Sequence, residues 1–288
     1  MKHALTLRVG PAVFRVGSPW ASPLDALARL YAGYPHASGE PADFTVRLRP
    51  VKPWRRYVRP SIFITGDHSL ADAAPMALAH GLLAAEMGMN LQMALGWRRH
   101  LLLHAATVEK DGRALILSGE SGSGKSTLAA LLGERGWRLM GDEFALVDLT
   151  DGMLWPFPRL ISLKNAAIEA VRGVAGEGRL GPLMAATAKG DIRHLIPRPE
   201  HVAAMDRPAP PTLILFPRFG AEDSAARPVD PAECFVRLTQ ASTNYVALGE
   251  AGFHALTGLV STVPAVAIDY ASGAEGIAMV EALWDEAR

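Results

Sequence analysis

The stretch Gly119-Glu120-Ser121-Gly122-Ser123-Gly124-Lys125-Ser126 fits the phosphate-binding pattern G-x-x-x-x-G-K-[ST] at every fixed position. Its glycines let successive backbone N–H groups converge on phosphate oxygens without Cβ clashes. Lys125 would place a positive charge on the β- and γ-phosphates, and Ser126 would offer a hydroxyl to Mg²⁺. The sequence therefore predicts a binding site for a nucleoside triphosphate.

The residues on both sides of this stretch have the pattern that such a loop requires. Residues 114–118 predict a short buried strand that leads into the loop, and residues 126–134 predict a helix that leaves it. The N-terminus of that helix would point its positive end at the bound anion. We therefore expect ATP contacts from the whole loop and the first turn: Gly119, Glu120, Ser121, Gly122, Ser123, Gly124, Lys125, Ser126 and Thr127.

An acidic pair follows the loop at a short distance. Residues 137–140 predict the next strand, which ends in Gly141-Asp142-Glu143, and Asp142 comes 17 residues after Lys125. Such a pair suits two tasks, holding Mg²⁺ and taking a proton from an incoming hydroxyl. The alternative is an exposed turn after a strand, where Asp and Glu are common. The adjacent phosphate motif favours the functional interpretation.

Composition limits the class of protein. A chain of 288 residues predicts one large or two modest domains, and its 29 basic and 29 acidic residues give zero formal charge. This balance argues against bulk electrostatic binding to nucleic acid or to an acidic membrane. The single cysteine, Cys234, excludes an intramolecular disulfide and suits a reducing compartment. The first residues lack the apolar run of a signal peptide, so we expect a cytoplasmic protein.

The pattern along the chain predicts two regions, an N-terminal α+β region at 1–97 and a larger α/β domain at 98–288. A turn at Asp111-Gly112 is expected to join two strands of the larger domain. The expected elements before that turn are strands at 4–9, 12–16, 43–48 and 61–65, a helix at 23–31, a buried helix at 73–97, and one apolar strand at 99–108.

The most basic segment of the chain is 47–59, in which Trp54 and Tyr57 alternate with lysine and arginine. Basic residues interleaved with aromatic ones suit binding to RNA or to an acidic peptide. The other interpretation is a solvated hairpin with charged faces, and we favour that one.

The motifs together resemble the HPr kinase/phosphorylases and their relatives, which include kinases of peptide-maturation clusters and of lasso-peptide precursors. A more distant similarity is to ATP-dependent phosphoenolpyruvate carboxykinase. The family has a histidine, a phosphate loop and an acidic pair closely spaced in sequence. Here His104 precedes Gly119 by 15 residues, and Asp142 and Glu143 take the place of the pair. The resemblance covers about residues 98–270 and implies an α/β phosphate-loop core of this type.

The resemblance also implies roles for single residues. Asp142 would be the base for the acceptor hydroxyl, and Glu143, Ser126 and Asp142 would bind Mg²⁺. Lys125 would act on the transferred phosphate, and His104 would lie beside it. Three downstream residues are weaker candidates for phosphate or substrate contacts: Lys164, Lys189 and Arg193, the last two in an expected loop at 188–198 that also holds Arg198.

Two departures from the family pattern change what we expect. The family's Glu-Val-Arg-Gly signature, linked to the reverse, phosphorolytic reaction, is replaced here by Ser162-Leu163-Lys164-Asn165. The arginine of a second family element, Asn-Tyr-Arg, is Val246 after Asn244-Tyr245. We therefore expect a kinase that works in one direction, without phosphorylase activity.

Three functions from different classes remain open at this point. The first is an ATP-dependent serine kinase that acts on a small protein or ribosomally made peptide, with Mg²⁺ as its metal. The second is a small-molecule kinase, whose loop would be the same. The third is an ATP sensor without catalysis, against which the acidic pair argues. We expect neither a nucleic acid nor a membrane as partner, and a homo-oligomer is left open.

Overall fold

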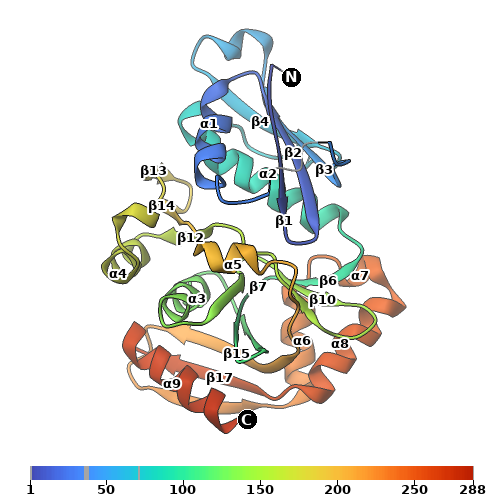
Figure 1. The fold of residues 1–288 in the computed structure, drawn as a ribbon, viewed down its shortest axis with the longest axis vertical. Helices are drawn as coiled ribbons and strands as arrows, with labels where there is room; N and C mark the ends of the chain where they lie inside the picture. The colour runs from blue at the N-terminus through green and yellow to red at the C-terminus, as the bar shows by residue number, and fades with distance from the viewer. Residues whose placement is uncertain (1, 36–38, 71, 288) are drawn as a thin grey trace. The chain divides into compact units, whose positions relative to one another are not determined.

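The computed structural model describes residues 2–35, 39–70 and 72–287, which form two compact units (Figure 1). The first unit contains Met1–Trp97 and Gly181–Ile192, and the second contains Arg98–Leu180 and Arg193–Arg288. Residues 181–192, which the sequence placed in the C-terminal domain, thus cluster with the N-terminal unit.

The first unit is built on a five-stranded sheet in the order β1-β2-β3-β4-β5. Two helices contact both the sheet and each other, so they cover one of its faces. The strands are β1 (His3–Val9), β2 (Ala12–Ser18), β3 (Phe44–Pro50), β4 (Ser61–Gly66) and β5 (Met76–Ala77). The helices are α1 (Ala21–Leu30) and α2 (Gly81–Gly96), with 3₁₀ turns η1 (Pro53–Arg56) and η2 (Leu78–His80).

Strand β3 explains how the sheet divides its side chains. Phe44, Val46 and Leu48 are buried, whereas Arg47 and Arg49 between them are exposed, as the period of two of a strand requires. Helix α2 approaches this strand closely, because a Cβ on Gly88 would lie 2.4 Å from the Val46 side chain. A glycine at this point of α2 is therefore a packing requirement.

The helix expected at 73–97 is shorter than the sequence indicated. It begins at Gly81, because Met76 and Ala77 instead pair with Ile62 and Ser61 as the edge strand β5. Pro75 is consistent with a start after residue 75, since a proline disfavours the helical conformation at the residue before it, here Ala74.

The second unit has a six-stranded mixed sheet in the order β16-β17-β15-β8-β7-β9. Its central strands β8, β15 and β17 are parallel, and β7, β9 and β16 are antiparallel to their neighbours. The strands are β7 (Ala105–Lys110), β8 (Arg113–Ser118), β9 (Arg138–Gly141), β15 (Pro211–Phe219), β16 (Ala225–Val229) and β17 (Ala265–Tyr270).

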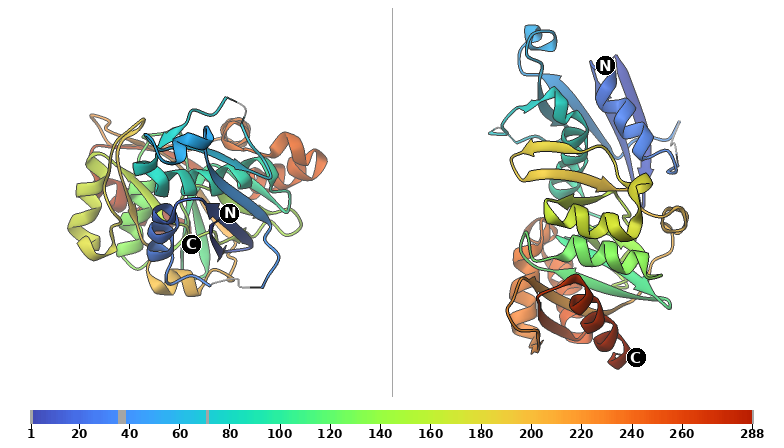
Figure 2. Two further views of the ribbon diagram at one scale, coloured as in Figure 1. Left: turned by 90° about the horizontal axis from the view of Figure 1, so that it is seen from above. Right: turned by 90° about the vertical axis from the view of Figure 1, so that its left-hand side faces the viewer.

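Strand β8 is buried on both faces. Leu115 and Leu117 belong to one core cluster, and Ala114 and Ile116 belong to another on the opposite face. Helix α3 lies between α4 and α9 on the first face, as the right-hand view of Figure 2 shows. The helices of the unit are α3 (Lys125–Glu134), α4 (Ala166–Ala175), α5 (Pro199–Ala203), α6 (Pro231–Ala241), α7 (Tyr245–Leu248), α8 (Glu250–Thr262) and α9 (Gly273–Glu286), with the 3₁₀ turn η3 (Glu177–Arg179).

The prediction of a single strand at 99–108 is wrong, because the segment forms two strands that separate at His104. Strand β6 (His100–Leu103) joins the small sheet β11-β10-β6, whereas β7 joins the main sheet. The buried Asn244 holds β6, since its Oδ1 accepts a hydrogen bond from Leu102 N and its Nδ2 donates one to His100 O, both at 2.9 Å. The other strands are β10 (Ala145–Asp148), β11 (Leu154–Trp155) and β12 (Ile161–Lys164).

The prediction of a loop at 188–198 is also wrong. Strands β13 (Met184–Thr187) and β14 (Gly190–Leu195) form an antiparallel hairpin there. Gly190 has a φ of 85° and supplies the turn between the strands, so the glycine marks a hairpin and not a break in regular structure.

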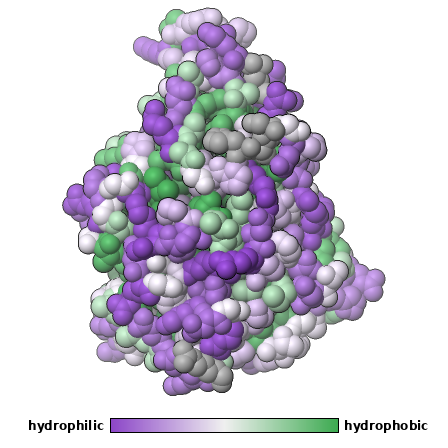
Figure 3. Space-filling model, viewed as in Figure 1, coloured by the Kyte–Doolittle hydropathy of each residue, from purple (hydrophilic) through white to green (hydrophobic). Residues whose placement is uncertain are grey.

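The face drawn in Figure 3 is mainly hydrophilic, with apolar residues in small patches between the hydrophilic ones. Among the described residues, none of the helices is both long and apolar enough to cross a membrane.

Candidate active site

The predicted phosphate loop, residues 119–124, connects β8 to α3, so the strand and the helix expected on its two sides are both present. Gly122 and Gly124 have φ angles of 90° and 98°, in the left-handed region that favours glycine, and Gly124 is the N-cap of α3. Glu120, Ser121 and Gly122 are exposed, so the tip of the loop is open to a ligand. The loop thus lies at the positive end of a helix, a position that favours an anion.

Two neighbouring strands hold the loop in place. Ser123 O accepts hydrogen bonds from Phe219 N at 3.1 Å and from Tyr270 Oη at 3.4 Å. Phe219 ends β15 and Tyr270 ends β17, so both lie at the carboxyl ends of strands parallel to β8. Burial raises the pKa of Tyr270, which keeps its hydroxyl protonated as a donor.

Lys125 is buried and turned onto its own loop. Its Nζ donates to Gly119 O at 2.6 Å and to Glu120 O at 2.8 Å. Burial lowers the pKa of Lys125, which the negative charges of Asp142 and Glu143 oppose. The ammonium group is therefore held at the loop by carbonyl oxygens, and a phosphate would be a stronger partner in the same place.

Asp142 is 3% exposed and follows β9. Burial, and next the negative charge of Glu143, raise the pKa of Asp142 to about 7, although hydrogen bonds from Ser126 and from the backbone of Ser162 favour the ionised form. Ser162 N donates to Asp142 Oδ2 at 3.3 Å, while Oδ1 is buried without a hydrogen-bond partner in the described part of the chain. A carboxylate oxygen is thus left for a metal or a proton.

The second carboxylate of the pair, Glu143, lies beside His104. His104 Nδ1 lies 3.7 Å from Glu143 Oε2, and the two side chains are 45% and 27% exposed. Burial lowers the pKa of His104, against the opposing effect of Glu143. The adjacent carboxylates therefore have different surroundings, Asp142 beside Ser126 and Ser162, and Glu143 beside His104.

The three weaker candidates have different positions. Lys164 ends β12 near the loop, since its positive charge adds to burial in lowering the pKa of both Lys125 and His104. Lys189 lies in the turn of the β13–β14 hairpin, within the first unit. Arg193 pairs with Glu177, its Nη2 donating to Oε1 at 2.7 Å. Of the three, only Lys164 has a charge that acts on Lys125.

The sequence analysis missed the two residues that brace the loop, Phe219 and Tyr270. A signal for them exists in the rule that ligands of open α/β sheets bind outside the carboxyl ends of parallel strands. Both residues end apolar runs, 211–219 and 265–270, that form such strands. Their proximity to Gly124 is a long-range contact that no local pattern specifies.

The residues present fit Mg²⁺ bound together with a nucleotide. The described residues hold no group of three or more His, Cys, Asp or Glu side chains able to bind a metal by themselves. Mg²⁺ commonly takes one or two carboxylates and completes its shell with phosphate oxygens and water. Ser126, Asp142 and Glu143 would supply such a partial set, and the buried Asp142 Oδ1 without a partner is the atom that favours it.

Comparison with known proteins gives a distant likeness to a solved structure. No family model matches the chain, and no curated protein matches it. Among solved structures, the chain is similar to the HPr(Ser) kinase/phosphatase from Coxiella burnetii at 12% sequence identity and a TM-score of 0.31, over 64% of this chain and 94% of that chain. At this distance the likeness establishes neither the family nor the activity of this chain.

Proposed function

We propose that this chain is an ATP-dependent kinase that transfers the γ-phosphate to a serine hydroxyl of a small protein or ribosomally made peptide. The observation that carries the proposal is the buried Asp142, whose charge acts on the loop lysine Lys125 and whose pKa is raised to about 7 by burial and by Glu143. A base with a pKa near the working pH is the most effective proton acceptor. An ATP sensor has no use for such a group.

In the proposed reaction the acceptor oxygen forms a bond to the γ-phosphorus as the bond to the β,γ-bridging oxygen breaks. ADP leaves with that oxygen, and the hydroxyl proton passes to Asp142. Lys125 and the amides of the loop bind the β- and γ-phosphates and stabilise their negative charge. Mg²⁺, held by Ser126 and Glu143 with Asp142, would neutralise further phosphate charge when bound.

The choice of a peptide hydroxyl rests on the sequence resemblance of His104, the phosphate loop and the acidic pair. The one-way reaction rests on the segment Ser162–Asn165, where this chain lacks the glutamate and arginine of the family signature. Ser162 interacts with Asp142 through its backbone N–H, a contact that does not depend on its side chain.

The test is phosphotransfer by the purified full chain from γ-labelled Mg-ATP. Serine-containing peptides and a panel of small hydroxyl compounds are offered in parallel, and products are identified by mass spectrometry. The proposal expects labelled phosphoserine in peptides and no label after Lys125→Ala. Transfer only to small compounds would make the chain a small-molecule kinase, and ATP binding with no transfer to any acceptor would make it a sensor. Incubating the phosphopeptide with inorganic phosphate tests the reverse reaction, which should yield no pyrophosphate.

A further inference from the structure

The first unit contains a groove that the proposed reaction does not use. Its volume is about 900 Å³, and every residue that lines it belongs to this unit. It is formed by α1, the turn η1, the start of α2, the edge strand β5 and the chain that leads into β13. This volume lies at the upper end of the usual range for ligand sites, about 300–1,000 Å³.

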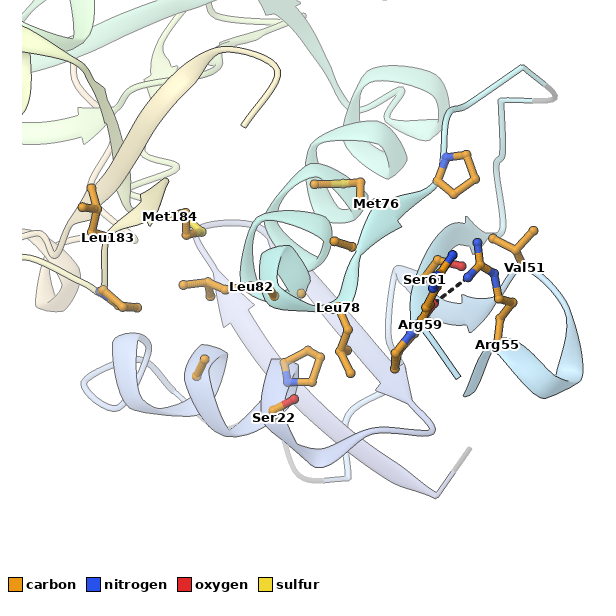
Figure 4. A pocket seen from close by; sticks show the side chains of 18 residues that line it. Ser22, Val51, Arg55, Arg59, Ser61, Met76, Leu78, Leu82, Leu183 and Met184 are labelled. Atoms are coloured by element: carbon orange, nitrogen blue, oxygen red, sulfur yellow. Dashed lines mark hydrogen bonds between the residues drawn. The ribbon is translucent and has the colours of Figure 1, made fainter. Parts of the chain in front are cut away.

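The two ends of the groove differ in chemistry, as Figure 4 shows. Leu82, Leu183 and Met184 line one end, and Leu78 and Met76 continue the apolar wall. At the other end two arginines, Arg55 and Arg59, lie beside Val51. Leu183 is 56% exposed and Val51 42%, so apolar surface faces solvent at both ends.

The arginines come from the basic segment 47–59, which has six lysines and arginines and no acidic residue. Arg55 Nη1 donates to Arg59 O at 3.0 Å, and its guanidinium group stacks on Trp54, 5.0 Å from the ring centroid. Within the described residues, neither Arg55 nor Arg59 pairs with a carboxylate. Arginines of the second unit differ, since Arg138 pairs with Glu109 and Arg218 with Asp269.

This positive charge is local, because the whole chain has a formal charge of zero. An apolar wall that ends at two arginines without acidic partners is complementary to a segment in which apolar side chains are followed by carboxylates. The edge of the sheet lies in the same place, since among the strands that the structure describes β5 pairs with β4 alone, and Met76 and Ala77 line the groove. An extended peptide can add its backbone to such an edge.

We propose that this groove docks an acidic, leucine-rich peptide segment of the polypeptide that the kinase phosphorylates. The inference rests on the proposed function for the identity of the occupant, but the groove binds the segment without ATP. RNA fits less well, because the apolar wall offers few partners for a sugar-phosphate backbone. In addition, the rings of Trp54 and Tyr57 are each already stacked with a neighbouring arginine, Arg55 or Arg56.

The test is fluorescence anisotropy with a labelled peptide that carries three leucines, then three glutamates, then a serine. It is measured without ATP on the full chain. The double variant Arg55→Gln/Arg59→Gln should weaken binding about tenfold, the effect of two partly exposed charge contacts. The variant Leu183→Ser should weaken it through the apolar end. Arg15→Gln/Arg47→Gln, an equal change of two charges at exposed positions of the same sheet outside the groove, should leave binding unchanged.

Control probes identify the occupant. A peptide with lysine for glutamate, and one with serine for leucine, should bind at least about tenfold more weakly. Equal binding of the lysine peptide, tighter binding of an oligouridylate, or a wild-type affinity in the double variant would each overturn the proposal. So would a dimer, seen by sedimentation, that the groove variants dissociate, because the occupant would then be a second copy of the chain.

Phosphotransfer to the same peptide separates this inference from the proposed function. If the peptide binds and no acceptor is phosphorylated, the proposed function is wrong and the docking proposal stands. If the peptide is phosphorylated with the same KM by wild type and by the double variant, the docking proposal is wrong and the proposed kinase activity stands. Melting temperatures of all variants should match wild type, because the substituted side chains are not buried in the core.

Discussion

Gly124 of the predicted phosphate loop lies against Tyr270 at the end of β17, and a Cβ on residue 124 would come within 2.1 Å of the Tyr270 hydroxyl. The backbone there also has a φ of 98°, which side chains rarely adopt. The loop is therefore fixed from both sides, by its own conformation and by a strand far away in the sequence. Its shape is set before any nucleotide binds.

Replacing Gly124 by alanine should abolish nucleotide binding and destabilise the second unit. Gly122→Ala is the matched control, because Gly122 has a similar φ of 90° but nothing within 4 Å of its Cβ position. Backbone strain costs about 1–3 kcal/mol in each variant, and the clash with Tyr270 adds about 1–3 kcal/mol for residue 124 alone. Urea unfolding measures both, and equal losses would show that the Tyr270 contact is unimportant.

Lys125→Ala should remove Mg-ATP binding and phosphotransfer while the protein still folds, because the ammonium group contacts loop carbonyls and no core side chain. Wild type should show a rise in melting temperature with millimolar Mg-ATP, as ligand linkage requires, and the variant should not. Lys2→Ala, a charge change at an exposed position that belongs to no candidate site, is the control and should keep the shift. A folded Lys125→Ala protein with wild-type transfer would contradict the assignment.

Asp142→Asn and Glu143→Gln should fail differently, because the two side chains have different neighbours. Asp142→Asn should keep nucleotide binding and lose about two to four orders of magnitude in transfer rate, without rescue by Mg²⁺. Glu143→Gln should weaken Mg²⁺ affinity, so that added Mg²⁺ restores part of the rate. A Mg²⁺ titration of both variants decides between them. Rescue of Asp142→Asn alone would reverse the two roles, and identical behaviour would remove the distinction.

The raised pKa of Asp142 predicts a pH dependence of stability without nucleotide. Because the pKa in the folded protein is about 7 and the ordinary value is 3.8, the folded state binds the proton more tightly than the unfolded state. The free energy of unfolding should therefore fall as pH rises from about 4 to about 7, by at most about 4 kcal/mol from this group. Asp142→Asn should flatten that part of the profile, which urea unfolding at several pH values measures.

The same group predicts proton release when Mg-ATP binds. At pH 7 about half of the Asp142 carboxyls are protonated, and a bound cation favours ionisation, so binding should release up to about half a proton. Calorimetry in two buffers of different ionisation enthalpy measures this number. Asp142→Asn should release less, and proton uptake by wild type would contradict the raised pKa.

Local features of the chain were predicted from the sequence alone because they depend on neighbouring residues. The pattern Gly119–Ser126 and its flanking strand and helix need only backbone freedom, an apolar run and helix propensity. Asp111 and Gly112 both have positive φ, at 55° and 77°, as the predicted hairpin turn requires. Strand β3 follows from its alternation of apolar residues and arginines.

Only the tertiary structure decided the features that depend on residues distant in sequence. His104 separates two strands because Asn244, 142 residues beyond Leu102, holds β6 in another sheet. Arg193 lies in a strand and pairs with Glu177. Asp142 and Glu143 are equivalent in the sequence, but folding buries Asp142 beside Ser126 and leaves Glu143 beside His104. Burial and long-range pairing are properties of the packed chain, so the different chemistry of two adjacent carboxylates arises only on folding.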